Sequence, residues 1–269
     1  MKVMVTGATG FIGKELIKKL HEMGHEIVVL TTNPDSARFR IPVHCEIIPW
    51  DPCRNHLPST ALKGVDAVIN LAGENIADGR WSPERKRKLI QSRELSVRRL
   101  VNAMTYMDKK PKTLVSVSAI GFYGDRGDVI LNEADLKGHG FLSDVCKVWE
   151  EEILKAKEFG VRTVAYRLGM VLGHDGGALN KILPPFKLGL GGKLGSGSQW
   201  MSWIHINDLV NMLVHAIENP SMDGIYNAVS PNAVRNKEFT KTLGNILKRP
   251  TIFPVPKFVL KVVLGELSE

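Results

Sequence analysis

The chain has few cysteines and no long apolar run, and both absences limit what it can be. Its 269 residues include three cysteines, Cys45, Cys53 and Cys146, an odd number that does not suggest a disulfide framework. No uninterrupted apolar segment approaches the roughly 20 residues that cross a bilayer, and the N-terminus lacks the long apolar region of a signal peptide. We therefore expect a globular cytoplasmic protein without membrane contact, with an organelle of a larger cell as the alternative.

Metal-ligand spacing and nucleic-acid signatures are also missing. No close cysteine pair accompanies His44 and His56, so no metal site is expected. The net charge is +8, but eight of the basic residues fall between 80 and 100 against two acidic ones, on a segment with an apolar stripe. That pattern indicates a solvated helix face, or a basic entrance for an anionic cofactor or substrate. Without RNA-binding aromatics or zinc-finger spacing, nucleic-acid binding is not expected; the oligomeric state is not readable.

Strand-like runs alternate with helical patterns through most of the chain. Alternation of this kind is typical of an α/β fold with a doubly wound parallel sheet of the Rossmann type. The predicted strands are Lys2–Thr6, Glu26–Thr31, Glu46–Trp50, Asp66–Leu71, Thr113–Ser118, Arg162–Arg167 and Gly224–Val229. The predicted helices are 13–23, 84–106, 144–158, 205–218, with Asp208 as a cap near its start, and a helix capped by Asn236 that runs to about Leu247.

After Gly169 the chain becomes rich in glycine, which favours a loop-rich lobe over further regular sheet. We expect a dinucleotide-binding domain in residues 1–171, to which residues 204–230 return. Residues 172–203 and 231–269 then form a smaller C-terminal substrate lobe, and truncation of this lobe at its C-terminus is one option.

The N-terminal strand runs directly into glycines spaced three apart, Gly7, Gly10 and Gly13, ahead of a helical pattern. This arrangement places a dinucleotide pyrophosphate on a helix N-terminus. Gly7 permits the turn, Gly10 lets the backbone approach phosphate, and Gly13 allows close packing of the helix on the strand. An ordinary βα turn is the alternative. The expected cofactor contacts in this motif are Gly7, Thr9, Gly10, Phe11, Ile12 and Gly13.

The end of the second predicted strand selects the cofactor, because an acid there accepts the ribose hydroxyls of NAD whereas basic or hydroxyl groups accommodate the phosphate of NADP. Thr31, Thr32 and Asn33 stand at this position without an acid, and Arg38 and Arg40 follow. NADP(H) is therefore favoured, and NAD(H) is the alternative because Asp35 can reach back. The cofactor contacts expected here are Thr31, Thr32, Asn33 and Arg38, with Asp51 on the adenine side or as a simple turn residue.

Five motifs resemble one family. They are Thr6-Gly-Ala-Thr-Gly-Phe-Ile-Gly13, Asn70-Leu-Ala-Gly-Glu-Asn-Ile76 followed by Gly79-Arg-Trp81, Ser118-Ala-Ile-Gly-Phe-Tyr-Gly124, Arg167-Leu-Gly-Met-Val-Leu-Gly173, and Gly191–Gly197 leading to Trp203–Leu209. The chain resembles the extended short-chain dehydrogenase/reductase superfamily and, within it, the atypical branch of epimerase family proteins, family 39U. The resemblance implies a nicotinamide-dinucleotide fold that holds NADP, with Leu71, Ala72, Gly73, Lys147 and Arg167 as further cofactor contacts.

The superfamily's Tyr-x-x-x-Lys pair lets a lysine lower the pKa of a phenol that shuttles protons. In the register that uses Lys147, Ser143 replaces the tyrosine. Ser118 is the candidate for holding a substrate oxygen, and Tyr123, on the loop after the fifth strand, is an alternative phenol or a packing residue. The candidate catalytic residues are therefore Ser118, Tyr123, Ser143 and Lys147.

Loop residues with aromatic or hydrogen-bonding side chains suit a polar cyclic ligand. The substrate candidates of this kind are Arg80, Trp81, Gln199 and Trp200, with Trp203 nearby. These features predict an NADP(H)-binding oxidoreductase or epimerase-like enzyme that acts on a small polar substrate, sugar-related compounds included. The alternative is a dinucleotide-binding regulator or interaction protein with little or no turnover.

Overall fold

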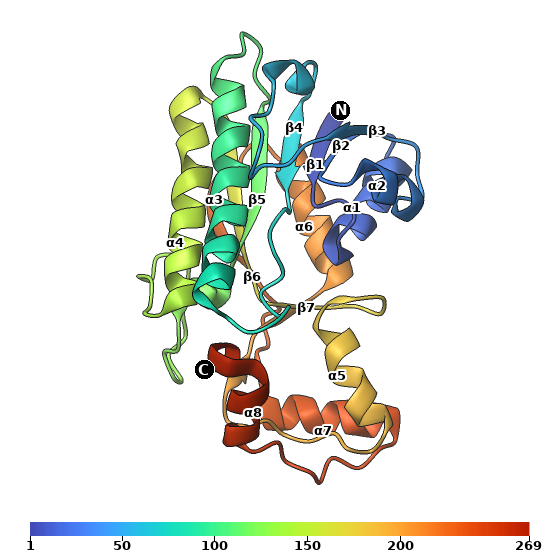
Figure 1. Ribbon diagram of the computed structural model, residues 1–269, viewed down its shortest axis with the longest axis vertical. Helices are drawn as coiled ribbons and strands as arrows, with labels where there is room; N and C mark the ends of the chain where they lie inside the picture. The colour runs from blue at the N-terminus through green and yellow to red at the C-terminus, as the bar shows by residue number, and fades with distance from the viewer. Residues whose placement is uncertain (269) are drawn as a thin grey trace.

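Seven parallel strands form the central sheet, in the order β10-β6-β5-β4-β1-β2-β3 (Figure 1). The computed structural model describes residues 1–268. The strands of this sheet are β1 (Lys2–Thr6), β2 (Glu26–Thr31), β3 (Glu46–Pro49), β4 (Ala67–Asn70), β5 (Thr113–Ala119), β6 (Arg162–Leu168) and β10 (Gly224–Ala228). Each was predicted to within one residue at either end, so the Rossmann-type fold expected from the alternating pattern is confirmed.

Helices cover both faces of the sheet. On one face α1 (Phe11–Glu22) and α6 (Ile206–Glu218) pack together, and on the other α3 (Pro83–Thr105) packs along α4 (Phe141–Leu154) (Figure 1). Because both faces are covered, the inner strands are buried and read as continuous apolar runs, such as Val3–Val5, of which no residue is accessible to solvent. Short 3₁₀ turns occur at Ser59–Leu62, Ile120–Tyr123, Lys155–Phe159 and Gly265–Ser268.

The sequence pattern did not predict three of the helices, which are α2 (Pro34–Arg40), α5 (Gly177–Lys187) and α8 (Lys257–Leu264). The first is only seven residues long, which is too short for a clear periodicity. The second follows a glycine pair and contains Pro184 and Pro185, residues that normally indicate a break in a helix. The glycine-rich segment after Gly169 is therefore less irregular than expected.

Two predicted helix caps are wrong. The N-cap of α6 is His205, whose Nδ1 accepts a hydrogen bond from the backbone two residues on at 3.2 Å, and Asp208 lies inside the first turn. The N-cap of α7 (Asn236–Leu247) is Arg235. Asn236 is buried instead, and its Oδ1 accepts the backbone N–H of Leu194 at 2.8 Å, so it fastens the glycine-rich loop to the helix.

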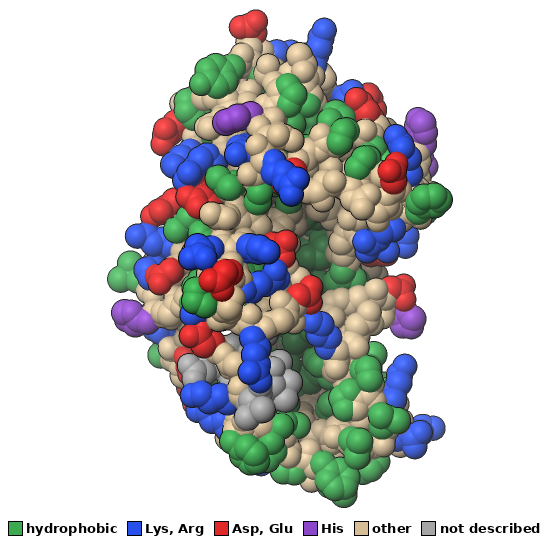
Figure 2. Space-filling view, viewed as in Figure 1, with side chains coloured by type: hydrophobic (Ala, Val, Ile, Leu, Met, Phe, Trp, Pro, Cys, Tyr) green, Lys and Arg blue, Asp and Glu red, His purple; other side chains and the backbone are tan. Residues whose placement is uncertain are grey.

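A lobe lies beyond the carboxyl edge of the sheet and contains α5, α7 and α8 (Figure 1). Two small sheets join it to the body: β7 (Met170–Leu172) pairs with β9 (Trp203–His205), and β8 (Trp200–Met201) pairs with β11 (Val234–Arg235). The surface is hollowed between the body and this lobe (Figure 2). Over residues 1–268 no helix is both long enough and apolar enough to cross a membrane.

Candidate functional site

The turn between β1 and α1 leaves almost no room for side chains. Gly7 has a φ of +70°, and a Cβ there would lie 2.7 Å from the carbonyl carbon of Leu71. A Cβ on Gly13 would lie 2.2 Å from the oxygen of Gly7. Gly10 is the N-cap of α1 and offers no side-chain cap, so the first backbone N–H groups of this helix are open to an anion.

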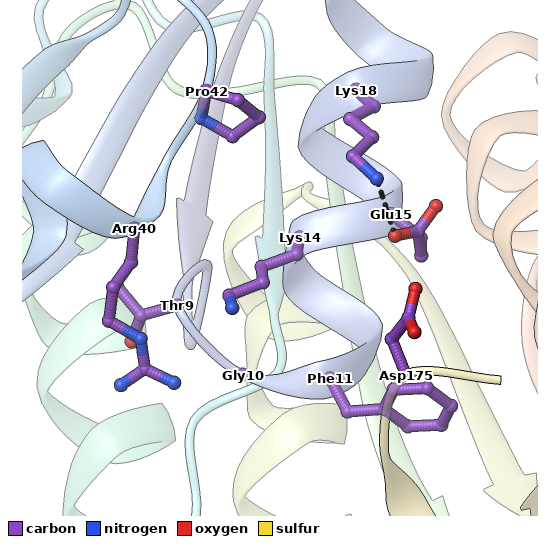
Figure 3. A pocket seen from close by; sticks show the side chains of 9 residues that line it. All are labelled: Thr9, Gly10, Phe11, Lys14, Glu15, Lys18, Arg40, Pro42 and Asp175. Atoms are coloured by element: carbon purple, nitrogen blue, oxygen red, sulfur yellow. Dashed lines mark hydrogen bonds and ion pairs between the residues drawn. The ribbon is translucent and has the colours of Figure 1, made fainter. Parts of the chain in front are cut away.

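A groove of about 380 Å³ opens beside this turn (Figure 3). Lys14 and Arg40 extend toward Thr9 on one side of the start of α1, whereas an acidic pair of side chains, Glu15 and Asp175, lies on the other side (Figure 3). The lining residues are Thr9, Gly10, Phe11, Lys14, Glu15, Lys18, Arg40, Pro42 and Asp175. The part of the groove next to the glycine turn is thus positively charged.

Phe11 and Ile12, both predicted cofactor contacts, use their side chains for packing. The Phe11 ring lies against the segment that enters the lobe, because a Cβ on Gly176 would be 2.4 Å from it and one on Gly177 would be 2.7 Å from it. Ile12 packs on the central core. The glycines that meet Phe11 explain part of the glycine richness of the lobe.

The tip of β2 is a self-contained turn that starts α2. Asn33 donates its backbone N–H to the Thr31 hydroxyl at 3.2 Å and accepts the N–H of Ser36 on its own side chain at 2.9 Å. Thr32 is exposed. Arg38 projects into solvent with 65% of its side chain exposed and pairs with Asp35 at 3.0 Å. It does not line the groove, whereas Arg40, two residues later, does.

Asp51, the predicted adenine contact, forms a turn after β3. Its Oδ1 accepts the backbone N–H of Cys53 at 2.8 Å, and its Oδ2 lies 3.4 Å from Arg54 Nε. The side chain is 31% exposed, so the carboxylate remains within reach of a ligand at this edge.

A buried series of hydrogen bonds joins the last residues of β1 and β4 to the middle of β5. Thr6 donates to Asn70 Oδ1 at 2.6 Å, and Asn70 Nδ2 donates to Ser116 at 3.0 Å. The Thr6 hydroxyl also accepts the backbone N–H of Ala72 at 3.1 Å. Sequence reasoning did not single out Thr6; its signal is a polar residue that ends an apolar strand. These hydrogen bonds hold the Leu71–Gly73 backbone next to the glycine turn.

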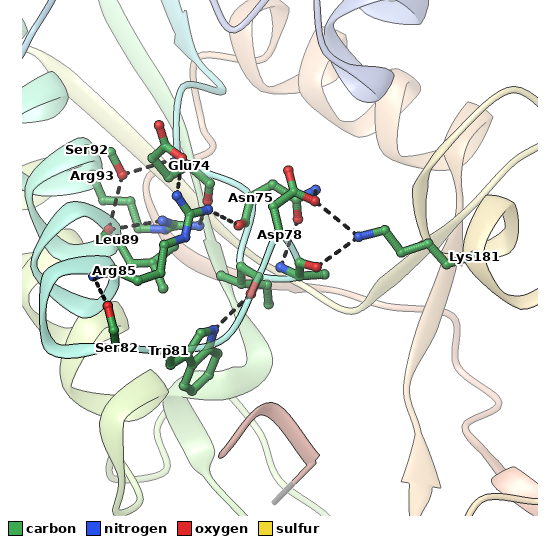
Figure 4. A network of polar contacts seen from close by, with 12 residues as sticks. Glu74, Asn75, Asp78, Trp81, Ser82, Arg85, Leu89, Ser92, Arg93 and Lys181 are labelled. Carbon is green, nitrogen blue, oxygen red and sulfur yellow. Dashed lines mark hydrogen bonds and ion pairs between the residues drawn. The ribbon is translucent and has the colours of Figure 1, made fainter. Parts of the chain in front are cut away.

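Residues 74–82 form a loop after β4 that the basic residues of α3 hold in place (Figure 4). Arg85 donates to the Glu74 carboxylate at 2.7 Å and to the carbonyl of Asn75 at 2.6 Å. Arg93 donates to the carbonyl of Glu74 at 2.9 Å, beside Gly73. From the lobe, Lys181 reaches Asp78 at 3.1 Å. Part of the positive charge on α3 therefore positions this loop rather than forming a purely solvated face.

The predicted substrate residues fall into two groups. Arg80 and Trp81 lie on the 74–82 loop, where the Trp81 indole donates to the carbonyl of Ile76 at 2.9 Å. Gln199 and Trp200 lie in the lobe. The Trp200 indole donates to Asp128 at 2.8 Å, and Gln199 donates to a loop carbonyl at 3.1 Å. The contact with Asp128 crosses from the lobe to the loop that follows β5.

Three other predicted site residues, Ser118, Tyr123 and Arg167, belong to one buried network. Arg167 donates from Nε and Nη2 to the two carboxylate oxygens of Glu150, at 2.9 and 2.8 Å, and from Nη1 to the Tyr123 hydroxyl at 2.9 Å. Ser118 donates to Glu150 at 2.8 Å, and Tyr123 donates to Asn227 at 2.7 Å. Burial alone would lower the pKa of Arg167, but its bonds to Glu150 raise it. These groups are turned toward one another inside the fold.

The remaining two catalytic candidates, Ser143 and Lys147, do not meet at the end of β5. Lys147 is half exposed and lies 3.6 Å from Glu151, while Ser143 is buried and donates to the carbonyls of Gly121 and Phe122 at 3.0 Å each. Leu142 and Cys146 of α4 also lie close to Gly121, within 4 Å of the position that its Cβ would take. They are one helical turn apart, and burial raises the pKa of Cys146 to about 11. Leu142 and Cys146 each precede one of the predicted residues, Ser143 and Lys147, by one position.

The parallel sheet and the glycine turn after its first strand define a Rossmann-type α/β protein. The model of the NAD dependent epimerase/dehydratase family matches residues 3–229, and the chain belongs to this family.

Named relatives agree with this assignment and confirm the resemblance drawn from the motifs. The chain is 42% identical over 275 residues to the Arabidopsis thaliana epimerase family protein SDR39U1 homolog, chloroplastic, covering 99% of this chain and 76% of that one. It is 36% identical over 269 residues to epimerase family protein YfhF of Bacillus subtilis, covering 100% and 87%. The crystal structure of human epimerase family protein SDR39U1 (isoform2) with NADPH matches with a TM-score of 0.87 at 35% identity, covering 99% of this chain and 86% of that one.

Proposed function

We propose that this protein is an NADP(H)-dependent oxidoreductase or epimerase-like enzyme that acts on a small polar substrate. The observation that carries the proposal is the groove at the start of α1, where three glycines leave backbone N–H groups open and two cations face the same space. Open backbone N–H groups and nearby positive charge are what a dinucleotide phosphate requires of its binding site. The human relative that was crystallised with NADPH supports the cofactor assignment.

The substrate side of the proposal rests on the hollow between the body and the lobe (Figure 2). Residues 1–171 and 204–230 would hold the dinucleotide, and residues 172–203 and 231–269 would cover the substrate. Contacts between the body and the lobe include those from Lys181 to Asp78 and from Trp200 to Asp128. Both are polar and exposed, which suits a hydrophilic substrate; sugar-related compounds are the first class to test.

One observation favours a second candidate, a dinucleotide-binding regulator with little turnover. The α4 residues beside the turn after β5 are Leu142, Ser143 and Cys146, which supply neither a phenol nor an ammonium group. A thiol whose pKa is about 11 stays protonated near neutral pH and is a weak general base. Proton transfer would then need a group from the lobe or from the substrate itself.

The test begins with titration of NADPH and NADH, followed through the fluorescence of the five tryptophans. Consumption of NADPH is then measured with a panel of carbonyl compounds that includes keto-sugars. Turnover whose KM for NADPH rises in Gly10→Ala, which narrows the phosphate site, supports the enzyme. Tight NADPH binding with no consumption across the panel supports the regulator, and failure to bind either nucleotide refutes both.

A further inference from the structure

The phenyl ring of Phe11 joins the dinucleotide groove to the lobe. Phe11 is the first residue of α1 and lines the groove, beside the segment that carries Asp175 (Figure 3). On the lobe side the ring packs against three glycines, because a Cβ on Gly173, Gly176 or Gly177 would lie 2.8, 2.4 or 2.7 Å from its atoms. These glycines lead directly into α5, so one side chain contacts both the groove and the entrance to this helix.

The helix that follows the glycines is weakly anchored. It buries one residue, Phe186, whereas α1 buries four and α6 buries seven. Its N-cap is Gly176, which has no side chain to cap the helix, and Pro184 and Pro185 inside it cannot donate backbone hydrogen bonds. A helix with so little burial opens more readily than the core helices. We call residues 173–187, the glycine segment together with α5, the strap.

The strap reaches the loop after β4 through Lys181. This side chain donates to the carbonyl of Ala77 at 2.9 Å and to the carboxylate of Asp78 at 3.1 Å (Figure 4). Both acceptors belong to the 74–82 loop, which Arg85 and Arg93 of α3 hold on the body. The strap therefore extends from the dinucleotide groove at one end to the 74–82 loop at the other.

We propose that the strap is a lid coupled to the dinucleotide. NADPH bound at the start of α1 fixes Phe11, the fixed ring seats residues 173–177, and α5 then ties the 74–82 loop to the lobe. The inference rests on the dinucleotide-binding function proposed above. Phosphate held by the first N–H groups of α1 restrains the backbone of Phe11, and a restrained ring is a better surface for the glycine segment than a mobile one. Ordering of this kind couples two sites that do not touch.

The charge on the strap opposes this coupling only weakly. Asp175 lines the groove, but its carboxylate lies 2.5 Å from the Nδ1 of His174. Both side chains are at least 80% exposed, so solvent and salt screen the repulsion between Asp175 and a bound phosphate. Asp175 also lies across the start of α1 from Lys14 (Figure 3).

The coupling acts equally in both directions. If NADPH favours the seated strap by a given factor, a change that unseats the strap weakens NADPH binding by the same factor. Couplings between sites commonly amount to fivefold or more. Gly176 provides the cleanest test of this reciprocity, because it meets the Phe11 ring and is not among the described residues that line the groove.

The experiment measures hydrogen exchange of the full chain with and without saturating NADPH. In the wild type, NADPH should slow exchange about fivefold or more in α5 and in the 74–82 loop. Phe11→Ala removes the ring and Gly176→Ala pushes the glycine segment off it, so both variants should lose this slowing. Phe39→Ala is the matched control, since it removes a phenyl ring that is 92% exposed on α2, and it should respond as the wild type does.

A second variant and a titration test the remaining steps. Lys181→Ala keeps the contact with Phe11, so NADPH should still slow exchange in α5, whereas the 74–82 loop should no longer respond. Titration with NADPH should show binding to Gly176→Ala weakened about fivefold or more, and binding to Phe39→Ala unchanged.

Each of the other outcomes counts against the lid. Slower exchange at the turn between β1 and α1 without any change in α5 overturns it and leaves the proposed function standing. A response of α5 that persists in Phe11→Ala and Gly176→Ala overturns it too, as does a loop response that survives Lys181→Ala. A wild-type chain that binds neither NADPH nor NADH removes the proposed function together with the lid. Should Phe11→Ala lose thermal stability, Phe11→Leu, which keeps an apolar side chain without the ring, repeats the test.

Discussion

Gly13→Ala tests whether the glycine turn is as tightly packed as the structure indicates. The new Cβ would lie 2.2 Å from the oxygen of Gly7 and 2.6 Å from the Cα of Ala8. Both neighbours are backbone atoms, so no side chain can rotate away. Since Cβ contacts below 3.0 Å essentially never occur, α1 must move from the turn by the difference between 3.0 and 2.2 Å, about 0.8 Å.

The cost of this movement can be worked out from what α1 packs against. Its buried residues Leu16, Ile17 and Leu20 are inaccessible to solvent, so the shift disturbs the core, and overpacking of this kind costs up to about 3 kcal/mol. Alanine recovers about 1 kcal/mol over glycine inside a helix. The net loss is then about 2 kcal/mol, which lowers Tm by about 4–8 °C in a protein of this size.

The assay is thermal and urea unfolding of Gly13→Ala beside Gly10→Ala. Gly10 has an ordinary φ of −76°, and a Cβ there would meet only the Gly7 oxygen, at 3.2 Å. We expect Gly10→Ala to shift Tm by no more than about 2 °C while weakening NADPH binding about tenfold, because the methyl group enters the phosphate path. A Gly13→Ala protein as stable as the wild type would refute the packing argument.

Three further predictions concern buried and exposed charges. Glu150→Ala leaves the buried Arg167 guanidinium without its carboxylate, and urea unfolding should show a loss of about 3–5 kcal/mol; a change near zero would contradict this. Burial lowers the pKa of His25 below 6.5, so the folded state resists protonation and loses stability as pH falls through 6.5. His25→Gln should flatten the decline of Tm between roughly pH 7 and pH 5. Lys147→Ala removes a half-exposed cation with only Glu151 beside it, so the NADPH dissociation constant should change less than about twofold; a tenfold rise would place Lys147 on the cofactor.

Regular elements with strong periodicity could be predicted from the sequence, and α2 and α5 could not. The strands β1 and β2 are apolar runs bounded by polar residues, and burial on both faces makes such runs hard to mistake. In α5 the local signals of Pro184 and Pro185 oppose helix formation. There the contacts of the helix with β7 and α7 outweigh the local propensity.

Candidate residues could be chosen by chemistry, but their partners could not. Ser118, Tyr123 and Arg167 carry groups that suit a site, and the fold turns all three toward Glu150 or Asn227. Glu150 is adjacent to two other acidic residues in the sequence, and nothing local distinguishes it. Its burial follows from the rotation of α4 against β5 and β6, which also turns Lys147 outward.

The sequence by itself determined the Rossmann-type sheet, the glycine turn and the family. Strand burial requires apolar runs, close backbone contacts require glycines, and the order of the motifs is read directly from the sequence. The tertiary structure alone decided which side chains meet at the groove. Arg38 and Arg40 carry the same chemical group. Arg38 nevertheless pairs with Asp35 in solvent, whereas Arg40 faces Thr9 beside Lys14. The physical reason is that the direction of a side chain depends on how its helix is rotated against its neighbours, and that rotation is set by contacts between residues far apart in the chain.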